Sequence, residues 1–146
     1  MSENLYLFLF SLVIFKKYFV IGNPIEHSLS PKLHNYWIKK NNINCFYIPL
    51  NVKSSELEKK LNFIRELGFC GLNVTIPHKE KIINLADEIM ESAKVIGAAN
   101  TIYFENGKII ADNTDTYGFY QSILKNFPKY NFKKEIVLIF GSGGAA

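Results

Sequence analysis

The sequence predicts an α/β fold in which a mainly parallel sheet is flanked by helices and carries one local β-hairpin. Short apolar runs that end at glycine or at polar residues alternate with segments whose apolar residues recur at helical spacing. The dipeptide Asn106-Gly107 separates two apolar runs and is a strong signal for a two-residue hairpin. The chain has 146 residues, 48% of them hydrophobic and 21% charged, which suffices for a folded domain with a sizeable core.

Apolar runs bounded by glycine or polar residues predict the strands, and apolar residues three or four apart predict the helices. The expected strands cover residues 18–22, 45–52, 71–76, 99–104, 108–111 and 135–140. The expected helices begin near Ser30 and Ser55 and cover residues 77–95 and 114–127. Because strands alternate with helices, most of the sheet is expected to pair in parallel.

Two of the helix starts carry capping signals. Ser30 precedes Pro31, which suits an N-cap followed by proline at the first helical position. Ser55 and Glu58 have the spacing of a capping box. Gly68 is expected to end the helix that this box begins, because glycine readily adopts the left-handed conformation of a helix C-terminus.

The net charge of +4 is spread along the chain, and the longest basic clusters are pairs such as Lys16-Lys17. This pattern favours a solvated surface over nucleic-acid binding, so no nucleic acid is expected as a partner. Cys45 and Cys70 each lie among apolar neighbours. They are interpreted as buried thiols in a reducing compartment, with no disulfide framework and no metal site.

Residues 1–17 are interpreted as an apolar N-terminal extension. The apolar run 5–15 is shorter than the roughly 20 residues that a membrane-spanning helix requires. Glu3 precedes the run and no basic start is present, so it differs from a signal peptide. A dispensable extension, or a start site placed too early, is favoured over a membrane or export role. We therefore expect a cytoplasmic protein.

Polar side chains lie at the ends of two predicted strands. Ser28 and Ser30 follow the first strand, whereas Asn73 and Thr75 lie two apart on the third and should face the same side. Each pair also has a purely structural interpretation, as a helix cap or as the polar end of a strand. Hydroxyl and amide groups at the carboxyl ends of strands are equally suited to bind a carboxylate or a polyol.

Lys79 and the acidic string 112–115 are the candidates for chemistry. At the third position of its expected helix, Lys79 adds positive charge near the positive end of the helix dipole, which costs stability. Such a violation marks function more often than structure, although a solvated surface lysine is the alternative. Asp112 or Asp115 can cap a helix, or can bring a carboxylate to Lys79. With Asn100 nearby, a Lys–Asp pair suits proton transfer to a polyhydroxylated substrate.

The chain closes on a glycine-rich segment that follows the last apolar run. Its residues are Gly141, Ser142, Gly143, Gly144, Ala145 and Ala146. They match the dinucleotide-binding fingerprint G-x-G-x-x-G/A, with alanine in the last position. The segment thus predicts the start of a Rossmann domain, without the helix that would hold the pyrophosphate or the residue that selects between NAD and NADP.

Together these motifs resemble the shikimate dehydrogenase family. The matching strings are IGNPIEHSLSPKLHN (21–35), GLNVTIPHK (71–79), IGAANT (96–101), DNTD (112–115) and GSGGA (141–145). They occur in the family's order and cover residues 18–146. The resemblance implies a substrate-binding domain over residues 18–127, followed by a linker and the start of an NADP-binding domain over residues 128–146.

The resemblance also implies roles for single residues. Lys79 and Asp115 would be catalytic, moving a proton at the C3 oxygen of the substrate while NADP exchanges a hydride. The substrate-binding residues would be Ser28, Ser30, Asn73, Thr75, Lys79, Asn100 and Asp115. The cofactor-binding residues would be Gly141, Ser142, Gly143, Gly144, Ala145 and Glu91.

The implied function is an NADP-dependent shikimate dehydrogenase, which reversibly reduces 3-dehydroshikimate to shikimate on the route to chorismate and the aromatic amino acids. Most of the cofactor domain has no counterpart in these 146 residues, so we expect a fragment with little or no activity by itself. A non-catalytic module that binds shikimate-like ligands, and a dehydrogenase that also uses quinate, stay open as alternatives. The resemblance is compatible with a monomer or a homodimer.

Overall fold

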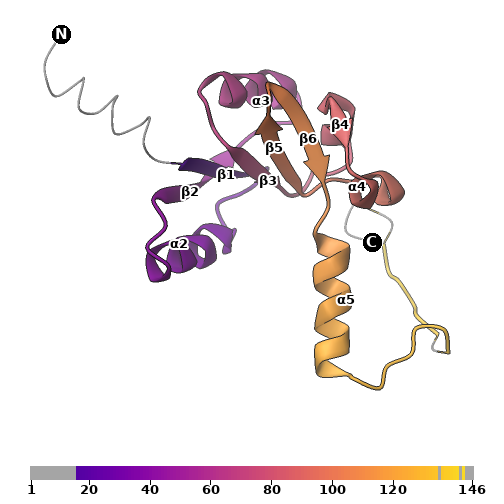
Figure 1. Cartoon of the computed structure of the whole chain (residues 1–146). Coiled ribbons are helices and arrows are strands. Elements are labelled where there is room, and N and C mark those ends of the chain that lie inside the picture. Colours follow the sequence, from indigo (N-terminus) through magenta and orange to yellow (C-terminus); the bar gives the residue numbers. More distant parts are fainter. Residues whose placement is uncertain (1–15, 135, 142, 144–146) are drawn as a thin grey trace, which may run out of the picture.

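The computed structural model describes residues 16–134, 136–141 and 143, which form a six-stranded sheet with helices around it (Figure 1). The strands are β1 Lys16–Gly22, β2 Cys45–Asn51, β3 Gly71–Val74, β4 Glu88–Ile89, β5 Thr101–Glu105 and β6 Lys108–Asp112. The helices are α2 Ser30–Lys40, α3 Leu57–Glu66, the 3₁₀ helix η1 Lys81–Leu85, α4 Glu91–Ile96 and α5 Asp115–Asn126.

The strand order is β2-β1-β3-β5-β6-β4, which confirms the α/β prediction. The pairs β1–β2, β1–β3 and β4–β6 are parallel, whereas β5 runs antiparallel to both β3 and β6. Because β5 runs in the opposite direction, its first residue, Thr101, pairs with Asn73 near the end of β3 and with Asp112 at the end of β6. Polar residues from three strands therefore meet at one edge of the sheet.

The two faces of the sheet are covered by different helices, because successive side chains of a strand point to opposite faces. Figure 1 shows α3 above the sheet and α2 below it. The α3 side holds the main core, which contains Phe19, Ile21, Leu57, Leu61, Ile64, Leu72, Val74, Ile82 and Ile102. Each fully buried leucine or isoleucine contributes about 1.5–3 kcal/mol to folding. The α2 side holds a smaller cluster of Val20, Ile25 and Tyr47.

The predicted hairpin is present between β5 and β6. Both turn residues have positive φ, 51° at Asn106 and 79° at Gly107. This combination defines the mirror-image turn whose twist matches that of paired strands, and asparagine followed by glycine is the sequence that adopts it most readily.

The predicted helix over residues 77–95 is wrong. The segment instead forms a turn, η1, the short strand β4 and α4. The backbone N–H of Asp87 donates to Ile109 O (2.8 Å), and that of Met90 donates to Ala111 O (2.9 Å). These bonds to β6 replace the hydrogen bonds of a continuous helix, so pairing with a strand distant in the sequence overrides the local helical preference.

Both predicted caps are also wrong. Helix α2 already includes Ser30, its N-cap is Leu29, and the Ser30 amide donates instead to the Ser28 hydroxyl (3.3 Å). Helix α3 begins at Leu57 without a side-chain cap, so Ser55 lies in the preceding turn. Capping signals locate these helix starts to within one or two residues, which is the usual uncertainty of a helix boundary.

The two ends of the described chain differ from the predicted regions. Strand β1 begins at Lys16, two residues before the predicted start of this strand, and residues 1–15 of the predicted extension lie outside the described part. The predicted strand over residues 135–140 is wrong for its described part, because residues 136–140 pair with no strand of the sheet and are exposed. None of the helices in the described ranges combines the length and apolar composition needed to cross a membrane.

Candidate active site

Lys79 lies in the turn that joins β3 to η1, and not inside a helix as predicted. Its position near a helix dipole is therefore not what distinguishes it. The turn follows the cis peptide bond between Ile76 and Pro77. The Lys79 carbonyl accepts a hydrogen bond from the Ala99 amide (2.8 Å), so the turn is tied to the segment just before β5.

His78 fixes this turn from the inside and was not predicted to have any role. Its side chain is fully buried, and Nε2 lies 2.7 Å from the backbone oxygen of Val52. Because a carbonyl only accepts, Nε2 is the donor in this contact. Within the described residues, Nδ1 has no hydrogen-bond partner. His78 thus anchors the backbone next to Lys79 to the loop after β2.

Asp115 is the first residue of α5 and lies opposite Lys79. The Lys79 Nζ and Asp115 Oδ2 atoms are 2.6 Å apart, with 15% of the lysine side chain and 45% of the aspartate side chain exposed. The Asp115 amide donates to Asn113 Oδ1 (2.9 Å), which fixes the start of the helix. Asp112, the other candidate carboxylate, accepts hydrogen bonds from Ser92 and from the Asn113 amide instead.

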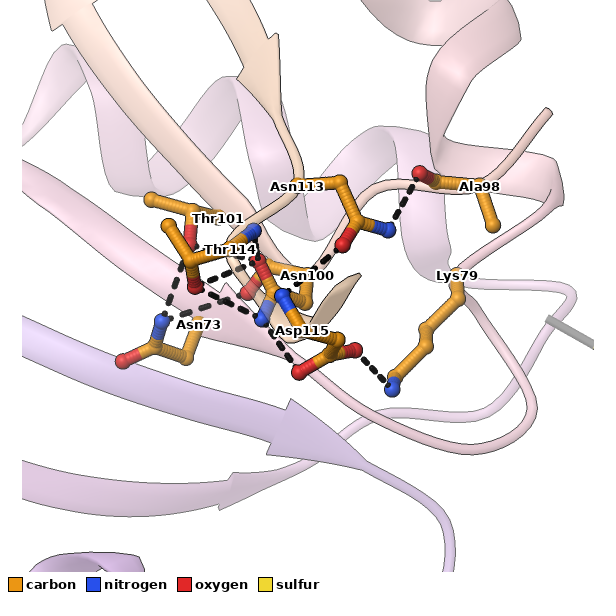
Figure 2. Close-up of polar contacts among 8 residues, drawn as sticks. All are labelled: Asn73, Lys79, Ala98, Asn100, Thr101, Asn113, Thr114 and Asp115. Atoms are coloured by element: carbon orange, nitrogen blue, oxygen red, sulfur yellow. Dashed lines mark hydrogen bonds and ion pairs between the residues drawn. The ribbon is translucent and has the colours of Figure 1, made fainter. Parts of the chain in front are cut away.

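Asn100 supports the carboxylate from the opposite side to Lys79 (Figure 2). Its Nδ2 donates to Asp115 Oδ1 (2.6 Å) and to Thr114 Oγ1 (3.0 Å). Its Oδ1 accepts from the Thr114 amide (3.0 Å) and from the Thr101 hydroxyl (2.8 Å). Asn100 is 9% exposed, so these bonds satisfy an amide that has little access to water.

Asn73 joins this network from β3. Its Nδ2 donates to the backbone oxygen of Asn100 (3.2 Å) and to Thr101 Oγ1 (3.3 Å). Its Oδ1 accepts from the Tyr47 hydroxyl (2.7 Å). Tyr47 was not predicted as a site residue, because it lies in an apolar run that predicts only a strand. The structure therefore brings together Asn73, Lys79, Asn100 and Asp115.

The other predicted substrate residues lie outside this network. Ser28 and Ser30 are half-buried at the start of α2, and within the described residues no hydrogen bond joins them to Lys79 or Asp115. The Thr75 amide donates to Ile21 O (2.9 Å), which places Thr75 at the end of β1, just before the loop that carries Ser28.

The predicted cofactor residues are only partly described. Glu91 is exposed at the start of α4, away from the hydrogen bonds of the network. Gly141 has a φ of +124°, which strongly favours glycine. A Cβ built on Gly143 would lie 4.0 Å from Glu80 Oε1, so this segment passes beside the turn that carries Lys79. Ser142, Gly144 and Ala145 lie outside the described residues.

This arrangement suits proton transfer to an oxygen atom. An ammonium has three N–H donors, and Asp115 uses one of those of Lys79. The remaining two are left for other oxygen acceptors. Across residues 16–134, 136–141 and 143, no group of three or more His, Cys, Asp or Glu side chains could hold a metal ion.

Fold and site together define an α/β domain that carries a lysine–aspartate pair beyond the ends of its strands. A sequence model described as "Shikimate dehydrogenase substrate binding domain" matches residues 20–102, more than half of the chain. The chain belongs to this family.

Individual relatives agree with this assignment. The shikimate dehydrogenase (NADP(+)) of Ruegeria sp. strain TM1040 is 44% identical over 128 residues, which are 87% of this chain and 46% of the relative. A crystal structure of a shikimate dehydrogenase in complex with NADP+ has a TM-score of 0.86 at 38% identity and covers 91% of this chain and 46% of that one. The enzyme from Thermus thermophilus in complex with shikimate has a TM-score of 0.80 at 32% identity, covering 89% and 49%.

The chain thus spans about half the length of the proteins that it matches.

Proposed function

We propose that the chain is the substrate-binding part of an NADP-dependent shikimate dehydrogenase, which interconverts 3-dehydroshikimate and shikimate. The observation that carries the proposal is the 2.6 Å contact between Lys79 and Asp115, with two lysine N–H groups left for a substrate oxygen. The family membership and the names of the relatives support the same reaction.

In the proposed mechanism, Lys79 holds the oxygen on C3 of the substrate by a hydrogen bond and gives it a proton during reduction. Asp115 keeps the ammonium aimed at that oxygen through their hydrogen bond. The reduced cofactor, NADPH, would supply the hydride when bound, and NADP+ would accept it in the reverse direction. In the reverse direction, Lys79 accepts the hydroxyl proton of shikimate.

For the rest of the substrate, we propose that Ser28 and Ser30 bind the carboxylate, helped by the N-terminus of α2. Asn73, Thr75 and Asn100 would contact the ring hydroxyls. The Asn100 amide already donates to Asp115 and Thr114, so a hydroxyl would share these bonds instead of finding a free donor.

For domain organisation, we propose that residues 18–127 form the substrate-binding domain. Residues 128–146 would be a linker and the start of the NADP-binding domain. The positive φ of Gly141 fits a glycine-rich phosphate-binding turn, because only glycine adopts such a backbone at little cost. Within this turn, Gly141, Ser142, Gly143, Gly144 and Ala145 would hold the pyrophosphate, with Glu91 as a further cofactor contact.

We further propose that the 146-residue chain alone has little or no dehydrogenase activity, because it spans about half of its relatives. A cytoplasmic location, and no nucleic-acid or membrane partner, belong to the same proposal. A monomer and a homodimer both stay open, and light scattering of the purified chain distinguishes them. Detectable shikimate-dependent NADP reduction by the purified chain would refute the proposed lack of activity.

A titration of the purified chain with shikimate tests the core of the proposal. We expect saturable binding of shikimate that Ser28→Ala weakens, while Ser122→Ala, which changes a serine of α5, leaves it unchanged. No binding of shikimate by a folded chain would contradict the proposal. Equal affinity for quinate would favour the quinate-using alternative, and binding without activity after a complete cofactor domain is joined would favour the non-catalytic module.

A further inference from the structure

Tyr47 is held more firmly than its place in an apolar strand requires. It is 4% exposed, and its ring stacks on the His34 ring of α2 with centroids 4.3 Å apart and planes 9° apart. The Asn35 side chain accepts from the Tyr47 amide (3.1 Å) and donates to the Tyr47 carbonyl (2.7 Å). Both backbone and ring are thus fixed by α2, and the hydroxyl reaches over β1 to Asn73.

The orientation of the Asn73 amide follows from what lies around it. Its Nδ2 is 3.2 Å from the backbone oxygen of Asn100, which can only accept a hydrogen bond. The NH₂ group therefore faces Asn100, and Oδ1 faces Tyr47. Because an amide oxygen only accepts, Tyr47 must donate its hydroxyl proton to Asn73. Burial raises the pKa of the Tyr47 hydroxyl above its ordinary value, so the proton is retained.

The orientation of the Asn100 amide is fixed independently. The backbone N–H of Thr114, which can only donate, lies 3.0 Å from Asn100 Oδ1. Asn100 Nδ2 therefore faces Asp115 Oδ1, at 2.6 Å. Between the two asparagines, Thr101 Oγ1 accepts from Asn73 (3.3 Å) and donates to Asn100 (2.8 Å).

These bonds form one continuous path, which we call the Tyr47–Asp115 chain (Figure 2 shows its part from Asn73 onward). Its members in order are Tyr47, Asn73, Thr101, Asn100 and Asp115. Every donor points toward the carboxylate. Hydrogen bonds aligned in this way polarise one another, so the first donor strengthens the last bond.

We propose that Tyr47 is a positioning residue that, through this chain, fixes the orientation of the Asp115 carboxylate paired with Lys79. The effect on substrate rests on the proposed function, whereas the effect on the asparagine amides does not. Without the Tyr47 hydroxyl, Asn73 Oδ1 loses a donor that no other described residue replaces. The amide then turns more freely, and its bonds toward Thr101 and Asn100 weaken.

Tyr47→Phe tests the proposal, with Tyr103→Phe as its matched control. Both tyrosines line the same cavity of about 310 Å³ on the α2 side of the sheet, but the Tyr103 hydroxyl has no hydrogen-bond partner among the described residues. Two quantities are measured on the ¹⁵N-labelled 146-residue chain: the side-chain NH₂ resonances of Asn73 and Asn100, and the dissociation constant for shikimate.

We expect Tyr47→Phe to shift both NH₂ resonance pairs and to weaken shikimate binding roughly tenfold, as loss of one buried hydrogen bond would. Tyr103→Phe should leave both quantities unchanged. Thr101→Val interrupts the chain at its middle and should shift the Asn100 resonances, which keeps the test decisive if Tyr47→Phe does not fold.

Unchanged NH₂ resonances in Tyr47→Phe, or equal shifts in both phenylalanine variants, would overturn the proposal. If the wild-type chain binds shikimate, and Tyr47→Phe shifts the resonances but leaves the affinity for shikimate unchanged, the link between Tyr47 and the carboxylate is overturned. If the wild-type chain does not bind shikimate, the proposed function fails, and the resonances alone decide the role of Tyr47.

Discussion

The ammonium of Lys79 lies 2.6 Å from the carboxylate of Asp115, although 36 residues separate them in the sequence. The lysine comes from the turn after β3, and the aspartate from the first residue of α5. Most of the lysine side chain is buried, with 15% exposed, whereas 45% of the aspartate side chain is exposed. The carboxylate is therefore the more solvent-accessible member of the pair.

A first prediction concerns the catalytic role of Lys79. When the chain is joined to the remaining half of the Ruegeria relative, Lys79→Ala should lower kcat by about 10²–10⁴-fold and change KM only a few-fold. A proton donor in the transition state contributes about that much. Lys81→Ala is the matched control, since Lys81 donates to the backbone of Ser54 and not to Asp115. A loss confined to KM would rule out the catalytic role.

A second prediction concerns pH. Burial lowers the pKa of His34 below its ordinary value of 6.5, so the folded chain binds this proton less readily than the unfolded chain does. The stability that this pKa difference gives the folded chain is complete above pH 6.5 and is lost as the pH falls below that value. From about pH 7.5 to about 5.5, Tm of the wild type should therefore fall more than Tm of His34→Gln. His27→Gln is the control, because His27 is exposed. If Tm of His34→Gln depends on pH as Tm of the wild type does, burial of His34 is not the cause of the pH dependence.

A third prediction concerns the buried His78. In His78→Phe the ring volume is kept but Val52 O loses its donor, which should cost about 1–3 kcal/mol in the free energy of unfolding by urea. His78→Gln retains an N–H donor and should recover part of the loss. If the phenylalanine variant is as stable as the wild type, the bond to Val52 does not anchor the turn.

A fourth prediction compares two glycines. Gly107 has a φ of +79°, so Gly107→Ala should destabilise the chain by about 1 kcal/mol or more. Gly118 lies within α5, and a Cβ there would meet no atom within 4 Å. Gly118→Ala should therefore stabilise by up to about 1 kcal/mol. Thermal unfolding of both variants checks the two signs: stabilisation by Gly107→Ala would contradict the turn geometry, and destabilisation by Gly118→Ala would contradict the free space at that helical position.

Local patterns predict the parts of the fold that local interactions decide. The hairpin at Asn106-Gly107 and the helix 115–126 need only a turn dipeptide or an apolar periodicity. The segment 77–95 has helical composition, but its structure depends on pairing with β6, a strand well beyond it in the sequence. No local pattern contains that pairing.

The candidate site divides in the same way. Polar residues at strand ends, such as Asn73 and Lys79, are unusual enough in their local sequence to attract attention. Tyr47 lies among apolar neighbours and looks like an ordinary core residue, whereas His78 stands beside Lys79 and Glu80 with no local signal that it is buried. Their roles depend on single distant partners, Asn73 and the Val52 carbonyl, which only the folded chain reveals.

The reversed direction of β5 has a consequence for how freely this domain can vary. The β5–β6 ribbon has its polar residues at one end, where Thr101 pairs with Asp112, and its turn at the other end, after Glu105 pairs with Lys108. Residues added at Asn106-Gly107 would lengthen the ribbon away from the chemistry and leave its spacing intact. Residues added next to Asn100 or Asp115 would shift one partner against the other. The turn end of the hairpin should thus tolerate insertions, whereas the end with the polar residues should not.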